Sequence, residues 1–144
     1  MQKKDFYTFP AILNYADDGI TISFPDFPGC LSCAFSDDEA VLMATDVLSL
    51  RLYIAEKSRE NIPNSSNTLI LKKTLAENEI VILVRVHMPV IRRKNSVKSW
   101  TRHEILEHPK KHGKVTVPIN VEALPEALTK KIFEFTGINP DDYE

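Results

Sequence analysis

The sequence has few of the residues that mark secreted, redox-active or membrane proteins. Only two cysteines, Cys30 and Cys33, occur among 144 residues, too few for a disulfide scaffold. No apolar run approaches the roughly 18 residues that a membrane-spanning helix needs. The residues that follow Met1 are polar and charged, unlike the apolar core of a signal peptide. We therefore expect a cytoplasmic protein with no membrane association.

Length and composition favour a single ordinary core. A chain of this length with 43% hydrophobic residues is close to the usual size of one domain, which excludes two large domains.

The charged residues are unevenly distributed along the chain, although the net charge is only -2. Residues 1–84 carry 7 Lys/Arg against 12 Asp/Glu, residues 85–114 carry 9 against 2, and residues 115–144 carry 2 against 6. The basic middle block can attract phosphate, or it can pair with acidic segments of its own chain or of a second copy.

Three strands are predicted before residue 36. Apolar residues alternate from Tyr7 to Tyr15 and from Ile20 to Phe24, on either side of the turn Asp17-Asp18-Gly19, which predicts a hairpin. Pro10 indicates that the first strand lies at an edge or bulge. A third strand is expected from Cys30 to Phe35.

A helix and a further strand follow. Ser36 precedes three acidic residues, the pattern of a helix N-cap, and apolar residues then recur at three- and four-residue spacing as far as Ile54. Residues 58–67 are polar and predict a loop, and a short extra strand is predicted at 69–71. The run from Ile80 to Val86 is apolar on both faces apart from Arg85, which is typical of a central strand.

The C-terminal third predicts two strands and a closing helix. The strands are expected around Trp100 to Glu107 and from Lys114 to Ile119, with a turn at 110–113 between them. Apolar residues then line one side of the predicted helix: Leu124, Leu128, Ile132 and Phe135.

Two motifs in the first third have both a functional and a structural interpretation. Cys30-Leu31-Ser32-Cys33 has the spacing of redox and zinc motifs, but residues three apart in a strand point to opposite faces, so we favour packing and predict no metal or cofactor. A proline-rich connection between two predicted strands consists of Phe24, Pro25, Asp26, Phe27 and Pro28. This connection is either a rigid crossover or a partner-binding rim, because aromatic residues on a stiff loop lose little entropy when immobilised.

Basic residues and one histidine are the candidates for nucleic-acid contact. The basic candidates for binding phosphate are Arg92, Arg93, Lys94, Lys98, Arg102 and Lys114, although such a run is more often a solvated connector. His103 could move the 2′-hydroxyl proton needed for RNA self-cleavage, because imidazole titrates near neutrality. An exposed or structural role is the alternative for this histidine.

Taken together, residues 7–12, 18–30 and 38–40 resemble the HicB antitoxin family in order and spacing, and the likeness continues through 80–89 to 94–98. The resemblance implies a β-β-β-α-β unit with a partial ribonuclease-H-like fold that neutralises small HicA toxins, which cleave messenger RNA. It does not imply hydrolysis, and no carboxylate pair that could surround magnesium is apparent in the sequence.

The remainder of the chain departs from the DNA-binding tails, helix-turn-helix or ribbon-helix-helix, that many HicB proteins carry. Residues 102–109, 113–118 and 128–138 instead resemble the C-terminal part of HicA, whose fold is similar to the double-stranded-RNA-binding module. In this resemblance His103 matches the catalytic histidine. However, the leading helix is missing and Thr101 and Arg102 replace the usual small residues, so an active ribonuclease is not expected.

The sequence therefore predicts an α+β protein with a HicB-like antitoxin domain (1–90), a basic connector (91–100) and a HicA-like β-β-α segment (101–144). We expect a non-enzymatic antitoxin that sterically blocks a HicA-type toxin through the rim at 24–28 and forms a homodimer or larger assembly. Two alternatives stay open: a weak or relic ribonuclease that uses His103, and RNA or DNA binding through residues 85–114. The sequence does not identify the toxin or the role of the HicA-like segment.

Overall fold

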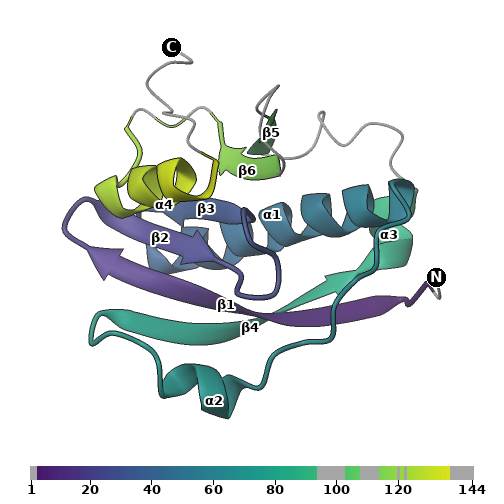
Figure 1. Cartoon of the computed structure of the whole chain (residues 1–144), viewed down its shortest axis with the longest axis horizontal. Coiled ribbons are helices and arrows are strands. Elements are labelled where there is room, and N and C mark those ends of the chain that lie inside the picture. Colours follow the sequence, from purple (N-terminus) through teal and green to yellow (C-terminus); the bar gives the residue numbers. More distant parts are fainter. Residues whose placement is uncertain (1–2, 94–102, 108–113, 120, 122, 137–144) are drawn as a thin grey trace.

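An antiparallel sheet and a long helix form the centre of the molecule (Figure 1). The computed structural model describes residues 3–93, 103–107, 114–119, 121 and 123–136. Within these residues one sheet has the strand order β3-β2-β1-β4, and two further strands pair with each other. The elements are β1 (Phe6–Ala16), β2 (Gly19–Ser23), β3 (Leu31–Ala34), α1 (Asp37–Lys57), α2 (Thr68–Lys72), β4 (Glu79–His87), α3 (Met88–Arg92), β5 (His103–Glu107), β6 (Lys114–Pro118) and α4 (Glu126–Thr136).

The predicted hairpin is confirmed. Strands β1 and β2 pair antiparallel from Ile12 opposite Ser23 to Ala16 opposite Gly19. Gly19 has a φ of +141°, a conformation that suits glycine, and a β-carbon at this position would lie 2.9 Å from Cγ of Pro125. The turn is therefore fitted both to the hairpin and to the chain that precedes α4.

Pro10 lies in an inner strand, so the prediction that this strand is at an edge is wrong. Strand β1 lies between β2 and β4. Pro10 is opposite Leu83 of β4, whereas the pairing of β1 with β2 begins only at Ile12. Proline is tolerated here because this part of β1 has a ladder partner on one side only.

Helix α1 begins where the sequence predicts. The Ser36 hydroxyl accepts a hydrogen bond from the Glu39 amide at 3.2 Å, and the acidic residues after Ser36 fill the first turn. The helix buries one face against the sheet. The main core unites this face with the inward residues of the strands: Tyr7, Phe9, Ala11, Leu13, Ile22, Met43, Val47, Leu48, Leu52, Val84 and Val86 are among its members.

The run from Ile80 to Val86 does not form a central strand. Strand β4 stands at the end of the sheet order, and the side chains of Ile80 and Leu83 are 47% and 61% exposed. Residues 69–71 belong to helix α2 rather than to an extra strand, because Asn67 caps the amides of Leu69 and Ile70. Helix α2 contacts β4 and lies beyond it in Figure 1.

The β-β-α order predicted for the C-terminal third is confirmed, with β5, β6 and α4 in sequence. We call these three elements the C-terminal unit. Val115, Val117, Leu128 and Ile132 form a second apolar cluster together with two residues of β3, Leu31 and Cys33. The prediction for Phe135 is wrong in part, because this side chain is 39% exposed. The C-terminal unit therefore packs on the end of the sheet.

Helices α1 and α4 lie on opposite faces of β3. Side chains alternate along a strand, and Cys30 and Ala34 belong to the main core while Leu31 and Cys33 belong to the second cluster. The prediction that the two cysteines face apart is thus confirmed.

No helix in the described part of the chain is long and apolar enough to cross a membrane.

Candidate protein-docking site

The proline-rich connection between β2 and β3 is built from two successive turns. The amide of Phe27 donates to the carbonyl of Phe24, and the amide of Cys30 donates to the carbonyl of Phe27, both at 3.0 Å. Gly29 follows with a φ of +87°. These turns hold both aromatic rings in fixed positions next to the main core.

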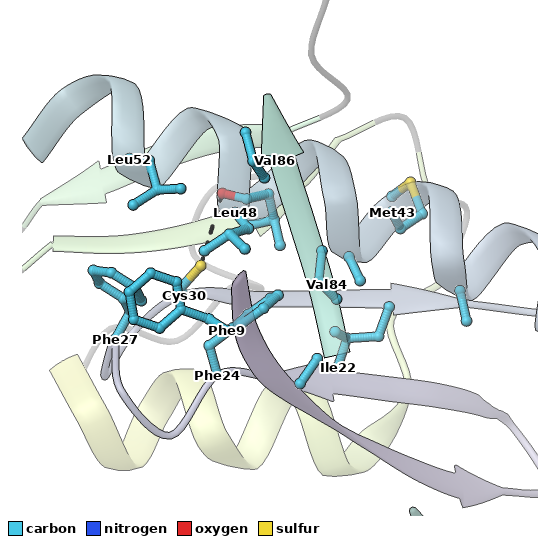
Figure 2. Close-up of a cluster of buried hydrophobic side chains, with 14 of the residues drawn as sticks. Phe9, Ile22, Phe24, Phe27, Cys30, Met43, Leu48, Leu52, Val84 and Val86 are labelled. Atoms are coloured by element: carbon cyan, nitrogen blue, oxygen red, sulfur yellow. Dashed lines mark hydrogen bonds between the residues drawn. The ribbon is translucent and has the colours of Figure 1, made fainter. Parts of the chain in front are cut away.

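Both aromatic rings of this connection point into the protein (Figure 2). Phe24 is 2% exposed and Phe27 is 4% exposed. The Phe27 ring meets that of Phe9 edge to face, with 4.8 Å between the centroids, and the guanidinium of Arg51 lies over Phe27 at 5.5 Å. The expectation that these rings present an aromatic rim is therefore corrected: they are core residues, because burying them stabilises the end of the sheet.

The exposed part of the connection consists of Pro25 and Pro28, with Asp26 half-buried between them. The carboxylate of Asp26 accepts a hydrogen bond from the Ser66 amide at 3.0 Å and a second, short one from the Ser66 hydroxyl. The loop is thereby tethered to the chain that precedes α2. What it offers to a partner is a stiff surface of two prolines beside a hydrogen-bonded carboxylate.

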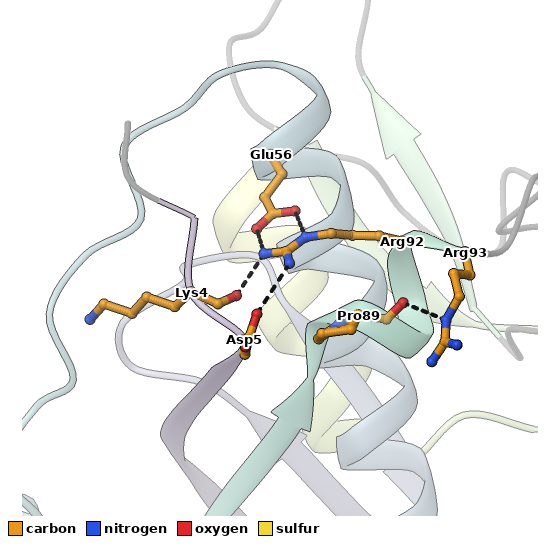
Figure 3. A network of polar contacts seen from close by, with 6 residues as sticks. All are labelled: Lys4, Asp5, Glu56, Pro89, Arg92 and Arg93. Atoms are coloured by element: carbon orange, nitrogen blue, oxygen red, sulfur yellow. Dashed lines mark hydrogen bonds and ion pairs between the residues drawn. The ribbon is translucent and has the colours of Figure 1, made fainter.

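Arg92 serves an internal ion pair instead of an open phosphate site (Figure 3). Its Nε and Nη2 atoms donate to the two carboxylate oxygens of Glu56 at 2.8 and 2.7 Å, and Nη2 also donates to the carbonyl of Lys4 at 2.6 Å. Asp5 lies 3.9 Å away. The hydrogen bond with Glu56 is the main reason that the pKa of Arg92 is raised. The arrangement fastens α3 to the end of α1 and to the start of β1.

The other basic candidates do not form a described patch with Arg92. Arg93 donates from Nε to the carbonyl of Pro89 at 3.1 Å on the surface of α3. Lys94, Lys98 and Arg102 lie outside the described residues, and for Lys114 the backbone on β6 is described but not the side chain. The phosphate-binding prediction is thus wrong for Arg92, and it stays a prediction for the others.

His103, the candidate catalytic residue, is buried in the contact between β5 and β3. It is 4% exposed, and its Nε2 atom lies 2.7 Å from the hydroxyl oxygen of Ser32, which is itself fully buried. An RNA 2′-hydroxyl would need to approach one of the ring nitrogens within hydrogen-bond distance. This burial supports the structural alternative over the catalytic one.

Both thiols are predicted to be unreactive in the folded protein. Burial raises the pKa of Cys30 to about 12 and that of Cys33 to about 11, from an ordinary value of 9.0, and the Cys30 thiol donates to the carbonyl of Val47. Alkylation by iodoacetamide near pH 8 should therefore be slow in buffer and fast in denaturant, since the thiolate is the reacting form. Both thiols have a higher pKa in the folded protein than in the unfolded chain, so the unfolded chain loses these protons at lower pH. The free energy of unfolding should therefore fall as the pH rises above 9. Rapid labelling of both cysteines without denaturant would contradict this result.

Three residues that build these contacts gave little signal in the sequence. Glu56 pairs with Arg92, but an acidic residue at this helix position is typical of a solvent-exposed face. Ser66 binds Asp26, but it lies in a stretch that predicts only a polar loop. The sequence predicts only a turn at Asp18, yet the carboxylate of this residue also accepts from the amide of Glu126, 108 residues further on. In the described part of the chain, no group of three or more metal-ligating side chains comes together.

Comparisons with known proteins show what this chain is similar to. The sequence model described as HicB-like antitoxin of a bacterial toxin–antitoxin system matches residues 8–92, more than half of the chain. A search of curated proteins found no match. Two similar solved chains come from a HicA3 and HicB3 toxin–antitoxin complex (16% identity, 54% of this chain and 95% of that chain, TM-score 0.43) and from a toxin–antitoxin complex of Streptococcus pneumoniae (16% identity, 96% and 93%, TM-score 0.49).

The matched region extends from β1 to the end of α3 and so contains the unit formed by β1, β2, β3, α1 and β4. Both TM-scores lie below 0.5, so the assignment rests on the family match. The predicted family is confirmed: the chain belongs to the HicB-like antitoxins of bacterial toxin–antitoxin systems.

Proposed function

We propose that this chain binds a HicA-type toxin, which cleaves messenger RNA, and neutralises it by steric cover. The match of residues 8–92 to the HicB-like antitoxins is the observation that carries the proposal. Nothing in the mechanism needs chemistry by the antitoxin. A rigid surface that occupies the toxin's RNA-binding face is sufficient, because RNA and antitoxin cannot occupy that face together.

The loop at 24–28 remains part of the proposed docking surface in a revised form. Phe24 and Phe27 hold the loop in place, and Pro25 and Pro28 are the side chains that a partner can contact. A stiff loop loses little conformational entropy on binding. Replacing both prolines with alanine should weaken toxin binding with little change in stability.

The direct experiment is a binding titration with a purified HicA-type toxin from the same organism as this chain. We expect a complex at micromolar or lower concentration that survives size-exclusion chromatography. Failure of the two proteins to associate at micromolar concentration would reject the proposed function.

A homodimer or larger assembly is a second part of the proposal. Large apolar side chains on α2 and β4 are exposed: Leu69 by 68%, Ile70 by 63% and Leu83 by 61%. Exposed apolar surface of this kind is typical of protein interfaces. Sedimentation analysis should show self-association that weakens when Leu83 is replaced with Glu, and a monomer at every concentration would contradict it.

Ribonuclease activity by His103 is not favoured by the burial of its ring. We predict that purified parent protein and His103→Ala cleave RNA at the same background rate. The substitution should instead lower stability by about 1 to 2 kcal/mol, because it removes the partner of the buried Ser32 hydroxyl. Cleavage by the parent that disappears in His103→Ala would restore the ribonuclease hypothesis.

A further inference from the structure

Strand β3 is fully covered although it ends the main sheet. All four of its residues, Leu31 to Ala34, are buried. Helix α1 covers one face, while β6 and α4 of the C-terminal unit cover the edge and the other face (Figure 1). Without the C-terminal unit, this strand would present an open edge and two apolar side chains to water.

The C-terminal unit is attached to β3 by few backbone contacts. Among the described residues, a single parallel bridge joins Thr116 of β6 to Cys30, just before β3, and the amide of Thr116 donates to the carbonyl of Gly29 at 2.8 Å. By comparison, β2 and β3 pair over four residue pairs. In the part of the chain that the structure describes, the side-chain contact between β3 and β5 is that of the Ser32 hydroxyl with Nε2 of His103, at 2.7 Å. The unit is therefore docked on the sheet and does not extend it as a full strand would.

A second contact fixes the start of α4 to the hairpin turn. The Asp18 carboxylate accepts from the amide of Glu126 at 2.8 Å, which caps the helix. Pro125 packs against Gly19. The docking surface thus extends from the β1–β2 turn to Gly29, and its apolar centre belongs to a small cluster that is separate from the main core.

This end of the molecule is also acidic. An open surface pocket of about 500 Å³ is lined by the turn at 15–20 and by residues 35–37. Asp17, Asp18 and Asp37 are exposed around it, and the hydroxyl of Tyr15 donates to Asp37 at 2.7 Å. A protein that binds RNA needs a basic surface for the phosphates, so the charge of this region is complementary to that of such a partner.

We propose that the β3 side of the sheet is a docking surface for a strand–strand–helix module, and that a HicA-type toxin competes with the chain's own C-terminal unit for it. The C-terminal unit then acts as a built-in occupant that weakens toxin binding. The inference rests on the proposed function. Release of the C-terminal unit would open the β3 side, whereas helix α2 contacts β4 at the opposite end of the sheet.

Hydrogen exchange of the unaltered chain tests this competition. On saturation with a catalytically silenced form of the HicA-type toxin, backbone amides of β5, β6 and α4 should exchange at least about tenfold faster. Amides of β3 should stay protected, because the toxin replaces the C-terminal unit above them. Unchanged or greater protection of β6 and α4 in a complex that has formed would overturn the inference and leave the proposed function intact.

A reversible lock provides the second measurement. In Thr116→Cys with Cys33→Ser, the new cysteine is the bridge partner of Cys30. Neighbouring strands lie about 4.8 Å apart, within the roughly 4.4 to 6.8 Å between the α-carbons of a disulfide. Because the Cys30 thiol is unreactive in the folded protein, the disulfide is formed by oxidative refolding and verified by mass spectrometry. The toxin should then bind at least roughly tenfold more weakly than after reduction. Equal binding by the oxidised and reduced forms would overturn the competition. Absence of binding in both forms and in the parent chain would reject the proposed function itself.

A matched pair of variants tests the attachment of the C-terminal unit to the β1–β2 turn. Asp18→Ala removes the cap of α4 and should bind the toxin roughly fivefold more tightly than Asp17→Ala, since less of the protein is held in the occupied state. Asp17→Ala is the control because it removes the same negative charge and leaves the hydrogen bond between Asp18 and Glu126 in place. Equal affinities for the two variants would contradict competition at this surface.

Discussion

Replacing Phe27 with alanine should lower the free energy of unfolding by about 3 kcal/mol. The ring is 4% exposed, packs edge to face on Phe9, and is covered by the guanidinium of Arg51. Truncation removes apolar surface from the main core and leaves a cavity that the fixed turns around Phe27 cannot readily fill. Urea unfolding followed by circular dichroism measures the difference.

The matched control is Pro28→Ala in the same loop. Pro28 is exposed, so its replacement should change stability by less than about 1 kcal/mol. If Phe27→Ala retained full stability and lost only toxin binding, the ring would belong to the binding rim and its assignment to the core would be wrong.

Replacing Arg92 with alanine should cost about 2 kcal/mol of stability. The loss leaves the carboxylate of Glu56, whose side chain is 6% exposed, without its bidentate partner. Breaking a buried pair costs roughly 3 to 5 kcal/mol, and the smaller value expected here reflects the 26% exposure of the Arg92 side chain. Arg92→Lys should recover only part of the loss, because an ammonium cannot make both parallel hydrogen bonds.

Arg93→Ala is the control for charge alone. This neighbouring arginine has the same charge and donates only to an exposed carbonyl, so its replacement should change stability by less than about 0.5 kcal/mol. Thermal unfolding of both variants and of Glu56→Gln separates the contribution of the Arg92–Glu56 pair to stability from the effect of charge alone. Equal effects of the two arginine substitutions would show that the pair with Glu56 contributes nothing specific.

Features that depend on neighbouring residues were predictable from the sequence. The N-cap at Ser36 needs only the next three residues, and the β1–β2 hairpin needs only a turn between two alternating segments. The opposite placement of Cys30 and Cys33 follows from the twofold repeat of a strand. Such patterns are local, so no tertiary contact had to be known.

The position of β4 was not predictable in the same way. An apolar run on both faces normally indicates a central strand, but β4 ends the sheet and leaves Leu83 exposed. The same pattern occurs in an edge strand when one of its faces binds a partner or packs on another element. Strand order is a tertiary property, and the sequence of one strand does not contain it.

The roles of Arg92 and His103 depended on partners far along the chain. A basic run looks solvated or phosphate-binding until Glu56, 36 residues away, is placed beside it. Likewise, His103 has the chemistry of a catalyst, and only its position against Ser32, 71 residues away, gives it a structural role. Side-chain type alone could not separate these functions.

The most direct test is an RNA-cleavage assay in which this chain is titrated into an active HicA-type toxin from the same organism. The account predicts that cleavage falls in proportion to added protein and stops near equimolar amounts, with His103→Ala inhibiting as well as the parent. Undiminished cleavage in the presence of excess folded protein would contradict the central claim that residues 8–92 form a toxin-neutralising platform.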